Sequence, residues 1–290
     1  MLDIKIFNVD HGFCAAIAID KAHQVIVDTG YGINSRFSLK RYLLCHAIKR
    51  LDYLILPAFN EEGLSGFYDL LAHALSNQFS ISRILTNPSV EVDNLPELVI
   101  RTFSVYNSLS ILRQVCQRFS NVERTIHLGG AELSFFWNTY PEFLDFHNLS
   151  LVTFLSCQDV CIIFPGNLKA EGWKALLRNS RFCDRLRHVN LFVASKYGQI
   201  DGYCSDVFNY CHPELVIISD GNQDRLSTQE KSQCEHYVKK FQHLSEYCRV
   251  LTTHNSGDIT IQQSSSGAIQ VSTQRRKRHQ ISQSRFIQYE

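Results

Sequence analysis

The sequence predicts an α/β fold of four layers, an αββα sandwich with two sheets inside and helices outside. A strand–helix alternation runs through the first 90 residues and begins again after residue 130, so two successive halves each supply strands and covering helices. The chain has 290 residues, of which 44% are hydrophobic and 20% charged. That is enough material to bury one large layered core.

The N-terminal half opens with three short strands and then alternates helices with strands. Leu2, Ile4 and Ile6 alternate with polar residues, and two further apolar segments lead into Asp28-Thr29-Gly30. This spacing is typical of an antiparallel meander. The expected strands are 2–6, 13–19, 24–27, 52–56 and 81–85, and the expected helices are 37–49 and 66–75.

The C-terminal half repeats the alternation with different lengths. Apolar spacing at three and four residues predicts helices at 105–119, 169–177, 203–211 and 228–247. Short apolar segments predict strands at 132–137, 149–155, 160–164, 190–194, 215–219, 250–253, 258–262 and 268–271.

Composition narrows the class of protein. The formal net charge is +1, so no overall field favours nucleic acid or a membrane surface. No apolar run approaches the roughly 20 residues of a membrane span, and the N-terminus resembles a strand rather than a signal segment. The ten cysteines include no C-x-x-C pair, which favours reduced thiols. We therefore expect a soluble, cytoplasmic protein.

The last residues differ from the rest. A basic run formed by Arg275, Arg276, Lys277 and Arg278 opens a polar stretch that reaches Glu290. We expect a domain at 1–273 and a flexible basic tail at 274–290. Such a run is usually solvated, and the alternative is contact with nucleic acid or a protein partner.

Several short segments, in order and at matching spacing, resemble the metallo-β-lactamase-fold hydrolases. The segments are FNVDHG at 7–12, IVDTG at 26–30, LDYLIL at 51–56 with LSG at 64–66, HNLSLV at 147–152, FPGNL at 164–168 and ASKYG at 194–198. The resemblance is closest to the branch that contains the hydrolase domain of ComEC-type DNA-uptake proteins and standalone bacterial relatives. It covers about residues 2 to 271 and implies the αββα sandwich. The fold-motif residues that this chain keeps are Asp28, Gly30, Gly66, Gly166 and Gly198.

The resemblance also implies where a metal site would be. Working members of the family hold two metal ions, commonly zinc, through a His-x-His-x-Asp-His motif, a bridging aspartate and further histidines, and the metals activate water. In this sequence the motif has become AFNEEG at 58–63, the aspartate has become asparagine, and a histidine pair has become Lys-Tyr. The altered positions are Ala58, Asn60, Glu62, Gly63, Asn148, Asn167, Lys196 and Tyr197.

These replacements remove the donor atoms that the chemistry needs. Ala58 and Gly63 offer no side-chain ligand, Asn60 and Asn167 are neutral amides, and the Lys196 ammonium repels cations. Glu62 retains a carboxylate. We expect Asp28 to hold loop backbone and His11 to fill space beside the former site, and the alternative is that Asp10, His11, Asp28 and Glu62 converge as a site for a hard cation. We interpret the pocket as degenerate, with no catalytic residue, metal ligand or cofactor.

Besides a nucleic-acid-binding module that would use the basic tail and Lys196, two functions remain open at this stage. The first is a catalytically inactive binding or scaffold subunit of a bacterial intracellular assembly with protein partners, linked to DNA metabolism or defence as the resemblance implies. The second is a metal-dependent hydrolase or nuclease that acts on phosphodiesters through a non-standard site and needs zinc. A nucleophilic Ser195 with His254 lacks the Gly-x-Ser-x-Gly elbow that serine hydrolases of the α/β type carry.

Overall fold

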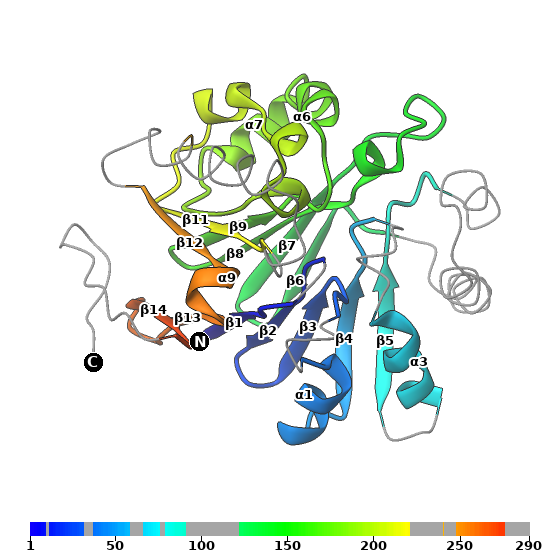
Figure 1. The fold of residues 1–290 in the computed structure, drawn as a ribbon, viewed down its shortest axis with the longest axis vertical. Helices are drawn as coiled ribbons and strands as arrows, with labels where there is room; N and C mark the ends of the chain where they lie inside the picture. Colours follow the sequence, from blue (N-terminus) through cyan, green and yellow to red (C-terminus); the bar gives the residue numbers. More distant parts are fainter. Residues whose placement is uncertain are drawn as a thin grey trace.

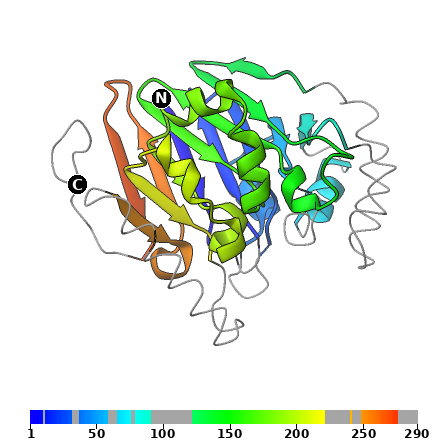
Figure 2. The ribbon, with the colours of Figure 1, turned by 90° about the horizontal axis from the view of Figure 1, so that it is seen from above.

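Two seven-stranded sheets pack face to face, and helices cover the outer face of each (Figure 1). The computed structural model describes residues 1–9, 12–31, 37–58, 66–75, 79–90, 122–220, 240 and 248–275. Figure 2 shows the same layers after a quarter turn, with helices of the second half in front of their sheet. The predicted αββα sandwich is confirmed.

The first sheet combines the N-terminal half of the chain with two strands from its C-terminal end. Its order is β14-β13-β1-β2-β3-β4-β5. The pairs from β14 to β3 are antiparallel, as the meander predicts, whereas β3, β4 and β5 are parallel. The bounds are β1 Leu2–Ile6, β2 Ala15–Ile19, β3 His23–Val27, β4 Arg50–Ile55, β5 Ser80–Leu85, β13 Ile259–Gln263 and β14 Ile269–Thr273.

The second sheet is mixed as well. Its order is β12-β11-β10-β9-β8-β7-β6, with antiparallel pairs from β6 to β9 and parallel pairs from β9 to β12. The bounds are β6 Thr125–Leu128, β7 Ala131–Phe136, β8 Val152–Cys157, β9 Val160–Phe164, β10 Leu191–Val193, β11 Leu215–Ile218 and β12 Arg249–Thr252. β6 was not predicted from the sequence.

Helices lie where parallel strands need a crossover connection. In the first half, α1 (Leu39–Cys45) connects β3 to β4, and α3 (Phe67–Leu75) lies between β4 and β5. In the second half, α6 (Ala170–Leu176) and α7 (Ser180–Leu186) lie between β9 and β10, and the short α9 (Thr253–Ser256) follows β12. α1 and α3 pack on the outer face of the first sheet, and α6 and α7 pack on the outer face of the second.

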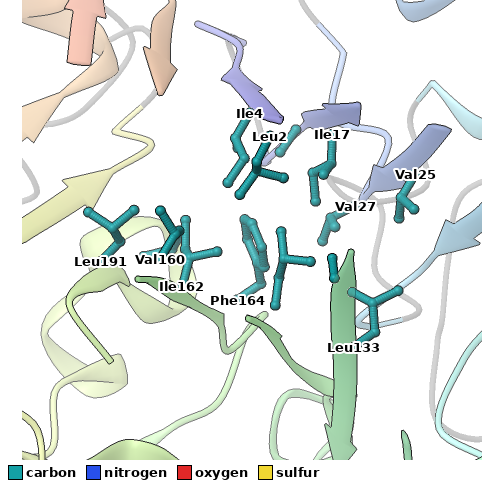
Figure 3. Packing of buried hydrophobic residues seen from close by; sticks show 14 of the residues in the cluster. Leu2, Ile4, Ile17, Val25, Val27, Leu133, Val160, Ile162, Phe164 and Leu191 are labelled. Carbon is teal, nitrogen blue, oxygen red and sulfur yellow. The ribbon is translucent and has the colours of Figure 1, made fainter. Parts of the chain in front are cut away.

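The main core lies between the sheets. Leu2, Ile4 and Ile17 from one sheet point toward Ile162 and Phe164 from the other (Figure 3). Alternate residues on the same strands face the helix layers instead, as the two-residue period of a strand requires. Complete burial of one such side chain contributes about 1.5–3 kcal/mol.

One predicted helix is wrong. Residues 203–211 form a short 3-10 segment, η5 (Ser205–Asn209), rather than an α-helix. The buried residues Cys204 and Val207 are three apart, which suits a 3-10 turn as well as an α-helix. Pro213 also disfavours helical backbone at His212 and so prevents extension.

Two predicted helices lie wholly or almost wholly outside the described residues, and one observed helix was not predicted. The helix predicted at 105–119 and all but residue 240 of the one predicted at 228–247 lie outside the described residues. α7 was not predicted, although the Asn179 side chain caps it by accepting a hydrogen bond from the Arg181 N–H. Within the described part of the chain, no helix is long and apolar enough to cross a membrane, and all eight cysteines are free.

The first two residues of the expected tail form backbone hydrogen bonds with the domain. The Gln274 N–H donates to the Asp258 carbonyl (2.9 Å), and the Arg275 N–H donates to the Ser256 carbonyl (2.8 Å). Two residues assigned to the tail are therefore bonded to the turn after β12. Arg276, Lys277 and Arg278 lie outside the described residues.

Candidate functional site

Several predicted site residues meet where strands of both sheets end. Asp28 follows β3, Asn167 follows β9, and Tyr197 follows β10. Together they border a cavity of about 10 Å³, which is space for roughly one water molecule. The cavity is lined by Phe13, Val27, Asp28, Pro57, Phe164, Gly166, Asn167, Val193, Ala194 and Tyr197.

Asp28 is buried at the end of β3 and holds local backbone. Its N–H donates to the Ile55 carbonyl (2.8 Å), and its Oδ1 accepts from the Thr29 N–H (2.8 Å). The Gly66 N–H donates to the Thr29 carbonyl (2.8 Å), and a Cβ on Gly66 would lie only 2.5 Å from that oxygen. The close approach explains why this motif position needs glycine.

Asn167 presents a neutral amide at the end of β9, beside the cavity. The residue is 2% exposed, and its N–H donates to the Ser150 Oγ (2.9 Å). The Ser150 hydroxyl in turn donates to the His147 carbonyl (2.7 Å), which ties the turn after β9 to the start of β8. These bonds fix the turn and present an amide, not a carboxylate, at its end.

Lys196 and Tyr197 both adopt left-handed backbone, with φ of 49° and 57°. This conformation costs energy in non-glycine residues and persists where surrounding contacts enforce it. The Lys196 N–H donates to the Gly166 carbonyl (2.9 Å), and the Tyr197 ring packs against the core between the sheets. Gly198 continues the positive-φ run at 81°.

A charged cluster lies beside these residues. The Lys196 Nζ forms an ion pair with Asp201, whose carboxylate also lies 4.0 Å from the Lys169 Nζ. Lys169 donates to Asp145 Oδ2 (2.7 Å), and the opposite oxygen of Asp145 lies 2.8 Å from His147 Nδ1. Two lysines and two aspartates therefore neutralise one another in this cluster.

Burial and neighbouring charges shift two groups of this cluster. Burial lowers the pKa of His147, and the charges of Lys196 and Lys169 lower it further against the opposing effect of Asp145. Burial alone would raise the pKa of Asp145, but hydrogen bonds from Lys169 and His147 outweigh it, so this pKa lies below its ordinary value. Sequence reasoning missed Asp145, Lys169 and Asp201, although the Asp-x-His spacing at 145–147 is a signal for a local cap.

Both shifts predict that acid destabilises the fold. Because the pKa of His147 is lower in the folded than in the unfolded chain, the unfolded chain takes up a proton first as pH falls through about 6.5. Asp145 adds a second loss of stability below about pH 4. Urea unfolding at pH 7.5, 6.5, 5.5 and 4.5 should therefore give a falling unfolding free energy. His147→Gln should flatten the decline between pH 7 and 5; an unchanged slope contradicts the assignment to His147.

Asn148 does not line the cavity. Its Oδ1 accepts from the N–H groups of Lys169 and Gly172 (both 3.1 Å), which are among the first N–H groups of α6 and have no partner within the helix. Its own carbonyl accepts from Asn138 Nδ2 (2.9 Å). The side chain is directed to the helix layer, where it anchors α6.

The described residues do not fit a two-metal centre. Asp28 is the one carboxylate among the described residues that line the cavity, and Ala58 is buried without a donor atom. Across the described ranges, no group of three or more His, Cys, Asp or Glu side chains is arranged to hold a metal ion. Asp10, His11, Asn60, Glu62 and Gly63 lie outside those ranges.

Other nucleophiles are engaged or buried. The Ser195 hydroxyl donates to the Leu168 carbonyl, whereas the His254 N–H donates to Asp220 Oδ1 (2.8 Å), so the two residues belong to separate networks. Burial raises the pKa of Cys14 well above its ordinary value, and it also raises that of Cys204. Both thiols are therefore poor nucleophiles near neutral pH.

Comparison with known proteins identifies the fold. No protein-family model and no curated protein matches this sequence. Among solved structures, the metallo-β-lactamase-fold protein YhfI from Bacillus subtilis is similar over 93% of this chain and 100% of its own, with a TM-score of 0.50 and 8% identity. The chain has the metallo-β-lactamase fold.

A second similar protein is larger. CmlA, a diiron β-hydroxylase from Streptomyces venezuelae, matches 89% of this chain at 12% identity with a TM-score of 0.52, and its E377D mutant gives 0.55. The present chain spans 53% of CmlA, about half its length. At these identities the likeness establishes the metallo-β-lactamase fold and leaves activity to be argued from the site.

Proposed function

We propose that this protein uses the metallo-β-lactamase fold without two-metal hydrolysis and serves as a binding or scaffold subunit of a larger assembly. The observation that carries the proposal is the pairing of Lys196 with Asp201 beside the cavity. In the family that the sequence resembles, this loop supplies imidazole ligands. Here it supplies an ammonium group, and the nearby carboxylate neutralises that group.

The remaining wall supports the same proposal. The Asn167 amide and the Tyr197 ring border the cavity, and neither offers the imidazole or carboxylate ligand that a pair of zinc ions needs. A lysine ammonium offers no lone pair to a metal ion, and Asp201 is already paired with it. The fold-motif positions keep their turns, whereas the expected metal ligands are replaced. This combination supports a protein that keeps the fold without the hydrolysis.

The resemblance to the ComEC-like branch suggests the kind of assembly. We propose a bacterial intracellular complex linked to DNA metabolism or defence, with protein as the principal partner. Contact with nucleic acid through the basic segment that starts at Arg275 is an additional proposal. A metal-dependent hydrolase or nuclease acting on phosphodiesters is the competing function, and it requires zinc at this site.

Metal content separates the two functions. We expect the purified protein to hold less than about 0.1 equivalent of zinc or manganese, and its melting temperature to shift by less than about 1 °C with chelator or added zinc, because a ligand that binds only the folded state would raise it. Hydrolysis of bis(p-nitrophenyl) phosphate should stay at the level of buffer. Asp28→Asn serves as the matched variant. Near-stoichiometric metal that this variant loses, together with chelator-sensitive hydrolysis, would establish the competing function.

A further inference from the structure

A second, larger hollow lies between the edge strand β6 and helix α7, and it shares no described lining residue with the small cavity. Its volume is about 490 Å³, within the range of small-ligand sites. It is lined by Arg124, Thr125, Ser134, Phe135, Phe136, Asn179, Arg181, Asp184, Arg185 and His188. We call it the arginine groove.

The acidic side chains in and around this groove are already paired. Glu132 accepts from Ser134 Oγ (3.0 Å) and forms an ion pair with Arg185. Asp184 forms an ion pair with Arg187. Each of these two carboxylates therefore has an arginine beside it.

Two arginines of the groove have no such partner. Among the described residues, neither Arg124 nor Arg181 forms an ion pair. The neighbouring Glu123 pairs with Arg83 instead, with Oε1 3.7 Å from Nη1. Arg124 precedes β6, whereas Arg181 lies in the first turn of α7, so the two guanidinium groups come from opposite walls. The groove therefore carries two uncompensated positive charges.

Arg124 is also oriented for binding. Its guanidinium lies 3.7 Å from the centre of the Trp137 ring, a cation–π contact. Stacking occupies the face of the planar group and leaves the N–H donors along its edge for an anion. Burial lowers the pKa of Arg124, and the charge of Arg181 lowers it further, which agrees with two cations facing one space.

We infer that the arginine groove binds a phosphoryl group of a small organic phosphate. A phosphate ester carries up to two charges on one compact centre, which matches two guanidinium groups that approach from opposite walls. A single carboxylate would neutralise only one of them. Arginine forms paired N–H bonds to phosphate oxygens without a metal, so this site is independent of the degenerate pocket.

Calorimetric titration of the full chain with inorganic pyrophosphate tests the inference. Arg124→Ala and Arg181→Ala should each weaken binding at least about tenfold, because each removes charge-assisted hydrogen bonds to the phosphoryl oxygens. Arg181→Lys retains the charge without the paired donors and should fall between the wild type and Arg181→Ala. The exposed Arg178 lies outside the groove, so Arg178→Ala is the matched control and should bind as the wild type does.

Two further ligands identify the source of the phosphoryl group. A 12-nucleotide DNA strand that binds more tightly than pyrophosphate, with the same dependence on Arg181, supports phosphoryl recognition and assigns it to a nucleic-acid backbone. Succinate that binds as well as pyrophosphate overturns the preference for phosphoryl groups. Binding of pyrophosphate that survives both alanine substitutions, in variants that melt like the wild type, overturns the site itself.

Discussion

Replacing Gly166 with alanine should lower the unfolding free energy by about 3 kcal/mol. Its φ is +63°, a region that costs an L-residue about 1–2 kcal/mol. An added Cβ would also lie 2.6 Å from the Pro57 Cβ and 3.2 Å from the Ser150 Cβ, and such overpacking costs about 1–3 kcal/mol. For a domain of this size, the melting temperature should fall by roughly 6–12 °C.

Two other glycines separate these contributions. Gly267 has φ of +85°, and an added Cβ would lie 3.5 Å from Asp159 Oδ2, so Gly267→Ala should cost only the backbone penalty of about 1 kcal/mol. Gly130 meets one oxygen at 3.6 Å and has no positive φ, so Gly130→Ala should change stability by less than about 0.5 kcal/mol. Equal melting temperatures for all three variants would show that the turn after β9 tolerates a side chain. Such a turn would not hold Asn167 rigidly.

The strand pattern of the sandwich was predictable because burial enforces it. Leu2, Ile4 and Ile6 alternate with polar residues, and in the structure these three face the other sheet. α7 was less visible because it has only seven residues, so Phe182 and Leu186 give a single i, i+4 repeat. A short helix of this kind depends on packing against the sheet more than on its own sequence.

The candidate site was predictable only in part, since a residue type does not reveal which way a side chain points. The sequence brings Asp28, Asn167 and Tyr197 to one place through the ends of three strands, and the structure lines one cavity with them. The ion pair between Lys196 and Asp201 depends on two consecutive residues with left-handed backbone. Neither Lys196 nor Tyr197 favours that conformation by itself. Tertiary contacts impose it.

Replacing Asn148 with leucine should cost about 3 kcal/mol, although the change in volume is small. The Asn148 Oδ1 is the acceptor for one buried and one part-buried N–H group, and each buried donor left without a partner costs about 1–3 kcal/mol. A Cβ on Gly172 would lie 2.6 Å from this oxygen, which shows how closely α6 is packed against the amide. Thermal and urea unfolding should both report the loss.

The same variant decides what Asn148 does. If its amide holds α6, Asn148→Leu lowers stability and leaves any ligand affinity per folded molecule unchanged. The exposed Asn209 makes a matched control, and Asn209→Leu should change the unfolding free energy by less than about 0.5 kcal/mol. A leucine variant as stable as the wild type would contradict the anchoring of α6 by Asn148.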